Sequence, residues 1–77
     1  MADTFANVKD VIKEVMKISG DDITPATRFI EDLKADSMDQ FFLIDGFSEK
    51  FKLTISDEDA RNIKSVNDVV SYVNDHL

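Results

Sequence analysis

Ser37 is the residue whose position is best suited to chemistry, because it follows Asp36 at the start of an expected helix over about Ser37–Phe51. A helix N-terminus presents free N–H groups and a partial positive charge, and both stabilise a phosphate attached there. A phosphodiester on the Ser37 hydroxyl would therefore be well placed. The alternative is that Ser37 only caps the helix: it can form a capping box with Gln40, and Asp36 with Asp39 offers a second register.

The other polar residues give no support for catalysis or for a bound metal. Ser37 has no histidine with which to form a plausible triad, and His76, the only histidine, lies one residue from the end, where we expect an exposed position. The acidic runs at 21–22 and 57–59 lack the spaced ligands and the central glycine of an EF-hand loop. We therefore expect a protein that is not an enzyme and has no dedicated metal site.

Length, charge and cysteine content narrow the class of protein. Seventy-seven residues are enough for one domain, which we expect over residues 1–77. Sixteen acidic against nine basic residues give a formal charge of −7, which repels nucleic acid and steers the chain toward basic patches on partners. The chain has no cysteine, so any thiol that it uses must come from an attached group. We expect an acidic monomer in the cytoplasm, without stable membrane insertion, because neither a signal peptide nor a membrane-spanning apolar run is visible.

Apolar periodicity predicts an all-α fold, a four-helix bundle with a long loop between the first two helices and a short third helix. The first helix is expected over about Thr4–Ile18, followed by the stop signal Ser19-Gly20. The pattern is lost from Asp21 to about Asp36, and we expect this loop to be pinned onto the core by its apolar residues Ile23, Phe29, Ile30 and Leu33. The other helices are expected over Ser37–Phe51, after Ser56 with Asp59 in capping-box spacing, and over Val66 to about Asn74.

The apolar residues of the second helix do not form one stripe at about 100° per residue. A core face is formed by Leu43, Ile44, Phe47 and Phe51, with Phe41 at its boundary. The opposite side carries a set that looks like a docking ridge for a partner, namely Met38, Phe42, Asp45 and Glu49. The alternative is that the long loop covers Met38 and Phe42. Gly46 should cost about 1 kcal/mol relative to Ala, and we explain it by close packing against the long loop.

Asp36-Ser37-Met38 resembles the Asp-Ser-Leu signature of acyl carrier proteins, at which 4′-phosphopantetheine is attached to the serine. Residues 29–35 are similar to the family's segment leading into that serine. Residues 51–59 resemble its loop and acidic third-helix start, and residues 65–73 its final helix. The resemblance spans nearly the whole chain, so it is more specific than the three-residue motif alone.

The resemblance implies that a phosphopantetheinyl transferase modifies Ser37, using coenzyme A and a divalent cation, while Asp36 presents Ser37 and orients the metal-bound donor. The arm's terminal thiol then holds an acyl cargo as a thioester in fatty-acid or related lipid or polyketide biosynthesis. The implied partners are this transferase and acyl-transferring and chain-modifying enzymes with basic or apolar docking patches. Such carriers shelter the acyl chain between the second and third helices, where the lining we expect is Phe47, Ile55, Ala60 and Ile63.

Some residues depart from the family's pattern. Met38 replaces the usual Leu, and Phe42 stands where bacterial fatty-acid carriers usually present an acidic residue. Phe41 and Phe47 are bulkier than typical. These departures indicate a specialised rather than a housekeeping carrier, with neutral drift as the opposing interpretation. The alternatives in function are a peptidyl or D-alanyl carrier, or a non-carrier helical protein-interaction module whose Ser37 is only a cap.

Overall fold

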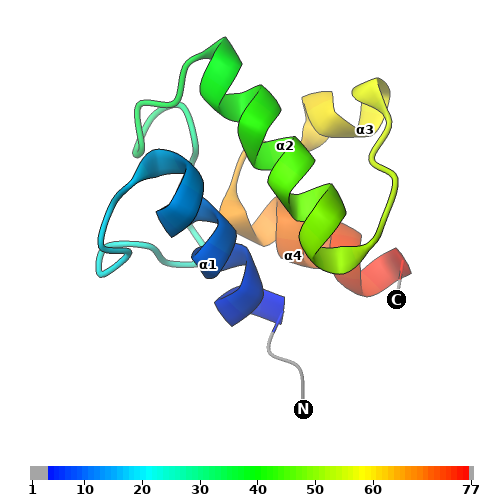
Figure 1. Ribbon diagram of the computed structural model, residues 1–77, viewed down its shortest axis with the longest axis horizontal. Helices are drawn as coiled ribbons and strands as arrows, with labels where there is room; N and C mark the ends of the chain where they lie inside the picture. Colours follow the sequence, from blue (N-terminus) through cyan, green and yellow to red (C-terminus); the bar gives the residue numbers. More distant parts are fainter. Residues whose placement is uncertain (1–3, 77) are drawn as a thin grey trace.

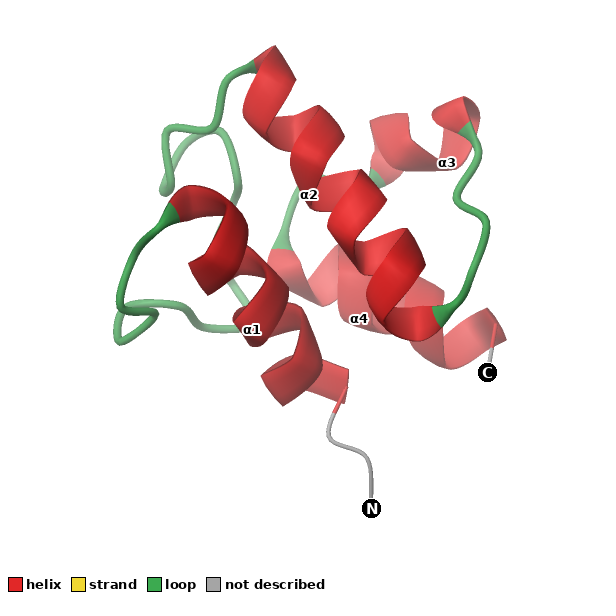
Figure 2. Ribbon diagram, in the orientation of Figure 1, coloured by secondary structure: helices red, strands yellow, loops and turns green. Residues whose placement is uncertain are grey.

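Four α-helices make up the regular structure of residues 4–76, which are the residues that the computed structural model describes (Figure 1). The helices are α1 Thr4–Met16, α2 Ser37–Phe51, α3 Asp57–Asn62 and α4 Val66–His76. Figure 2 shows them joined by one long loop, between α1 and α2, and by two shorter loops. The expected all-α fold with four helices and a short third one is confirmed. No helix of the described residues is both long and apolar enough to cross a membrane.

Helices α1, α2 and α4 share one apolar core, to which the long loop also contributes. Each of these helices carries apolar residues at three- and four-residue spacing on the side that faces the core. The rings of Phe29 and Phe47 meet within it, with centroids 6.1 Å apart. The buried apolar residues of the core are Val8, Val11, Ile12, Ile23, Phe29, Ala35, Leu43, Phe47, Ile63, Val66, Val69 and Val73.

The ends of two helices differ from the sequence prediction. Helix α1 ends at Met16, because Lys17 adopts the left-handed conformation with φ 56°. Ile18, the predicted last residue of the helix, therefore lies beyond it and is exposed. Helix α4 continues to His76, two residues past the predicted end at Asn74.

Backbone hydrogen bonds hold the long loop against the segment where α4 begins. They run from the Phe29 N–H to the Lys64 carbonyl (3.1 Å), from the Val66 N–H to the Thr27 carbonyl (2.9 Å) and from the Asn67 N–H to the Pro25 carbonyl (2.9 Å). An isolated bridge between Arg28 and Ser65 is the only β-type pairing among residues 4–76. The loop is therefore pinned, as the sequence predicted.

The apolar residues of the loop do not all reach the core. Ile23 and Phe29 are buried and Leu33 is half-buried, in agreement with the prediction. Ile30 is 55% exposed, so its predicted core position is wrong. The reason is a turn in which the Asp32 N–H donates to the Arg28 carbonyl at 3.0 Å, which turns Ile30 toward solvent.

Gly46 lies where α2 packs against α1. A Cβ atom at this position would lie 2.7 Å from Cγ1 of Val11 and 3.8 Å from Cγ2 of Val15. The lack of a side chain is therefore what allows the two helices to approach. Close packing was the right explanation for this glycine, but the long loop was the wrong partner, because α1 occupies the space.

Replacing Gly46 with Ala should lower the free energy of unfolding. Ala in a helix interior is favoured over Gly by about 1 kcal/mol, whereas overpacking a core destabilises by about 1–3 kcal/mol. We expect Gly46→Ala to destabilise by up to about 2 kcal/mol in urea unfolding. In a Val11→Ala background the same change should be neutral or stabilising, because the methyl group it meets is gone. A gain in stability in the native background would contradict this account.

Helix α3 is held in place by few contacts. None of its six residues is buried. The Ser56 hydroxyl accepts the Asp59 N–H at 3.1 Å, which confirms the predicted cap. The Tyr72 hydroxyl of α4 donates to the Asp59 carboxylate at 2.9 Å, and the Tyr72 ring stacks on His76 with centroids 4.1 Å apart. The bond between Tyr72 and Asp59 therefore ties α3 to α4.

Removing the Tyr72 hydroxyl should change how stability depends on alkaline pH. The hydrogen bond to Asp59, followed by desolvation, raises the pKa of Tyr72 above its usual value. A raised folded-state pKa contributes stability that is present below the unfolded tyrosine pKa of about 10 and lost as pH rises through the folded value. Tyr72→Phe should be less stable than the native protein at neutral pH, and this difference should be lost as pH rises through the raised pKa of Tyr72.

Urea unfolding across this pH range checks the prediction, and absorbance reports the ionisation directly because Tyr72 is the only tyrosine in the chain. Lysine titration is common to both proteins and cancels in the comparison. An equal loss of stability at alkaline pH in both proteins would show that the bond to Asp59 does not contribute.

Candidate functional site

Helix α2 begins with a capping box formed by Asp36 and Asp39. The Asp39 N–H donates to Oδ1 of Asp36 at 2.8 Å, and the Asp36 N–H donates to Oδ2 of Asp39 at 3.3 Å. Asp36 has the extended backbone typical of an N-cap, with φ −89° and ψ −175°. Of the two registers open from the sequence, the pairing of Asp36 with Asp39 is confirmed and the box of Ser37 with Gln40 is wrong.

The Ser37 hydroxyl is left unused by the fold because Asp36 performs the capping. Ser37 is the first residue of α2 and its side chain is exposed. Among residues 4–76 its hydroxyl makes no hydrogen bond. Asp36 accepts the Asp39 N–H, whereas the N–H groups of Ser37 and Met38 have no acceptor within the helix and point out from this end. This end of α2 thus presents a free hydroxyl together with backbone donors.

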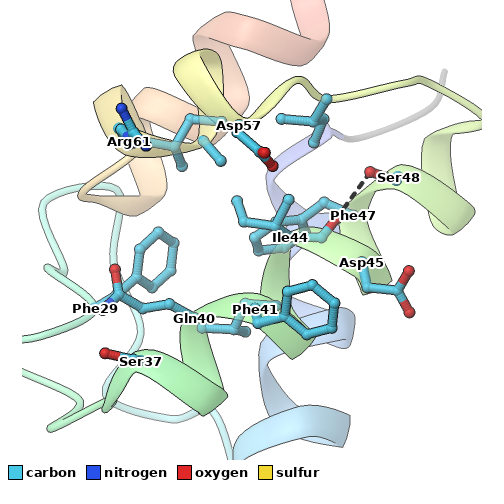
Figure 3. A pocket seen from close by; sticks show the side chains of 14 residues that line it. Phe29, Ser37, Gln40, Phe41, Ile44, Asp45, Phe47, Ser48, Asp57 and Arg61 are labelled. Carbon is cyan, nitrogen blue, oxygen red and sulfur yellow. Dashed lines mark hydrogen bonds between the residues drawn. The ribbon is translucent and has the colours of Figure 1, made fainter.

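An apolar pocket of about 410 Å³ lies between α2 and α3, and Ser37 lines one end of it (Figure 3). This volume falls within the range of about 300–1,000 Å³ that small-molecule sites occupy. The structure brings together all four residues that the resemblance suggested for a lining, which are Phe47, Ile55, Ala60 and Ile63. We call this hollow the α2–α3 pocket.

Sequence reasoning missed part of this lining. The additional apolar residues and one amide are Phe29, Leu43, Ile44, Phe41 and Gln40. A helical repeat from Ser37 would have found Gln40, Phe41 and Ile44, because residues three and four apart share one face. Phe29 comes from the long loop, so no periodic signal could have placed it here.

Polar side chains lie around the mouth of the α2–α3 pocket. Asp45 and Ser48 come from α2, while Asp57 and Arg61 come from α3 (Figure 3). The Ser48 hydroxyl donates to the Ile44 carbonyl at 2.9 Å, so it is already satisfied. Both Asp57 and Arg61 are exposed. The interior is therefore suited to an apolar chain and the rim to water.

The proposed docking ridge is exposed along α2. Met38 is 62% and Phe42 50% exposed, and Asp45 and Glu49 are exposed as well. The alternative in which the long loop covers Met38 and Phe42 is therefore wrong. Phe42, Asp45 and Glu49 also line a groove between α1 and α2, whose α1 side includes Val15. Met38 is not part of that groove.

Phe41 is more exposed than its expected position at the core boundary suggested. Its side chain is 67% exposed, and its ring meets the Phe42 ring edge to face with centroids 6.0 Å apart. Although the two rings touch, Phe41 lines the α2–α3 pocket and Phe42 lines the groove against α1. These two neighbouring phenylalanines thus line different hollows, one between α2 and α3 and the other between α1 and α2.

No metal centre accompanies these surfaces in the described part of the chain. Within residues 4–76, no three histidine, aspartate or glutamate side chains gather closely enough to hold an ion. Asp36 and Asp39 are instead engaged with each other's backbone at the start of α2.

Comparison with known proteins identifies the family. Residues 6–73 match the family described as phosphopantetheine attachment site. An acyl carrier protein from Helicobacter hepaticus is 46% identical over 71 residues, which are 92% of this chain and 93% of that protein. An acyl carrier protein from Clostridium perfringens is 40% identical over 72 residues, which are 94% of this chain and 95% of that protein.

Solved structures agree with this assignment. The structure of a candidate acyl carrier protein from Mycobacterium tuberculosis superposes with a TM-score of 0.89 at 29% identity, covering 97% of this chain and 100% of that one. Its helical fold is the one described above for residues 4–76. The family match, the two relatives and the fold converge: the chain belongs to the acyl carrier protein family, whose members hold 4′-phosphopantetheine covalently on a serine.

Proposed function

We propose that this chain carries acyl intermediates in fatty-acid or related lipid or polyketide biosynthesis, and that it catalyses no reaction itself. The observation that supports this proposal best is that Ser37 combines two features. Ser37 has an exposed, unbonded hydroxyl, and the same residue lines the end of an apolar pocket. A group attached there can therefore reach the pocket from the point of attachment.

Ser37 is the residue to which we assign the phosphopantetheine arm. Ser37 is exposed, so a transferase can reach it. When its hydroxyl oxygen becomes part of a phosphodiester, no hydrogen bond of the fold is lost. The backbone donors of the first helical turn favour an attached phosphate. When attached, phosphopantetheine supplies the thiol that this cysteine-free chain lacks, and cargo is held on it as a thioester. Asp36 presents Ser37 by fixing the residue at which α2 begins.

The α2–α3 pocket favours an acyl cargo over the alternatives. Burial of an acyl chain contributes about 0.8 kcal/mol per methylene. A D-alanyl or peptidyl group carries an ammonium or amide that loses hydration in an apolar interior without gaining a partner. A non-carrier interaction module would leave both the pocket and the free Ser37 hydroxyl without a role.

The docking ridge is the surface through which we expect partner enzymes to bind. Met38 and Phe42 supply apolar contact, and Asp45 and Glu49 attract basic patches. The phosphopantetheinyl transferase and the acyl-processing enzymes must all reach Ser37, and the ridge runs along the helix that begins there. Phe42 in the middle of this ridge favours a specialised carrier whose partners offer an apolar contact.

Ser37→Ala should abolish modification and leave the fold intact. Purified apo protein is incubated with coenzyme A, Mg²⁺ and a broad-specificity phosphopantetheinyl transferase, and intact mass is measured. We expect a gain of one phosphopantetheine in the native protein and none in the variant. Because the Ser37 hydroxyl makes no bond within residues 4–76, stability should change by less than about 0.5 kcal/mol.

Two variants serve as controls for this experiment. Ser71→Ala removes an exposed hydroxyl on α4 and should be modified like the native protein. Asp36→Ala removes the cap and should lower the free energy of unfolding by about 1 kcal/mol. Unfolding of Ser37→Ala would favour a structural serine, and failure of a cognate transferase to modify the native protein would favour the interaction-module alternative.

Phe42→Glu should change partner kinetics more than stability. The ring is half exposed, so its loss should lower the free energy of unfolding by less than about 1.5 kcal/mol. We expect kcat/KM for a partner with an apolar contact to fall by about tenfold, as for other central interface aromatics. Ile30→Glu makes a like change at an exposed position off the ridge and should leave the kinetics unchanged. A large stability loss in Phe42→Glu, without a kinetic change, would place Phe42 in the core instead.

A further inference from the structure

Phe41 is an exposed aromatic residue at the mouth of the α2–α3 pocket. It lies one helical turn after Ser37 and lines the pocket with 67% of its side chain in contact with solvent. Figure 3 shows its ring on the α2 side of the pocket, across from Asp57 of α3. Its ring also meets the Phe42 ring in a T-shaped contact with centroids 6.0 Å apart. The fold therefore leaves most of this ring uncovered.

The rest of the pocket is lined asymmetrically. Phe29 and Phe47 are buried and form the inner side, with ring centroids 6.1 Å apart. The polar side chains of the lining include Asp45 on α2, on the same helix as Phe41, and Asp57 and Arg61 on α3, across the pocket from it (Figure 3). An apolar chain inside would contact aromatic rings on its inner side, and Phe41 is the large apolar side chain available to cover its outer side.

This arrangement favours a position of the Phe41 ring over a chain that fills the pocket. An exposed side chain changes rotamer on a picosecond to nanosecond timescale, so the Phe41 ring is free to swing. Apolar surface removed from water is stabilising in proportion to its area. With the pocket filled by an aliphatic chain, the ring and the chain can shield each other, whereas an empty pocket offers the ring no such partner.

We propose that Phe41 is the outer cover of an aliphatic acyl chain in the α2–α3 pocket, and that it determines how firmly chains long enough to reach it are retained. The inference rests on the proposed function, because a chain is delivered to this pocket only from Ser37. It assigns to Phe41 a role toward cargo, which separates it from the adjacent Phe42 on the docking ridge.

The test compares two cargo lengths on the native protein and on Phe41→Ala. Acetyl and octanoyl forms are prepared from the corresponding acyl coenzyme A with a broad-specificity transferase, and complete loading is checked by intact mass. Thermal stability and the rate of thioester cleavage by hydroxylamine are then measured. We expect octanoyl to raise Tm over acetyl in the native protein, and Phe41→Ala to lose most of this gain. Octanoyl cleavage should accelerate by about tenfold in the variant, equivalent to about 1.4 kcal/mol, with acetyl cleavage unchanged.

Two further variants test whether the effect is specific to the Phe41 ring. Phe41→Leu retains apolar bulk and should show an intermediate loss, whereas Ile30→Ala truncates an exposed apolar residue outside both the pocket and the groove and should behave like the native protein. Equal octanoyl gains in the native protein and Phe41→Ala would overturn the inference. So would a loss that is the same for acetyl and octanoyl, because Phe41 would then support the fold. Absence of any mass gain, with a cognate transferase as well, would instead refute the proposed function, and this inference with it.

Discussion

Backbone hydrogen bonds between residues 25–29 and 64–67 are the constraint on which the arrangement of the other elements depends. The bond from the Phe29 N–H to the Lys64 carbonyl places Phe29 beside Ile63, and both residues line the α2–α3 pocket. The Phe29 carbonyl in turn accepts the Ala35 N–H at 2.9 Å, just before α2 begins. These backbone bonds hold the segment that leads into Ser37, and the Asp36 side chain then caps α2 at the next residue.

Under the proposed function, stabilisation and modification are divided between adjacent residues at the start of α2. Asp36 supplies the cap, a role worth about 1 kcal/mol, and forms a reciprocal pair with Asp39. Ser37 consequently does not cap the helix, although serine is itself a good capping residue. If Ser37 were the cap, modifying its hydroxyl would weaken the helix that presents it. The acidic pair avoids this conflict.

The sequence predicted most of what is decided locally. The bounds of α2 and the cap of α3 follow from capping residues and periodicity, and both are confirmed. The register at Asp36 and Ser37 stayed ambiguous because both pairings have the same spacing. Ile30 and Gly46 were misplaced because a loop turn and the packing of α1 decide their surroundings, and neither leaves a periodic signal. For the site, the four expected lining residues meet at the pocket, while Phe29 and the exposure of Phe41 depend on tertiary placement.

The weak attachment of α3 has a consequence for how long cargo can remain hidden. This helix has six residues, none of them buried, and forms one wall of the pocket. Elements of this kind open by local unfolding at a small fraction of the global free energy. If the pocket holds an acyl chain as proposed, the opening equilibrium of this one short helix can time its release while the core stays folded. Evolution can lengthen or shorten that residence time through contacts such as the one between Asp59 and Tyr72, independently of overall stability.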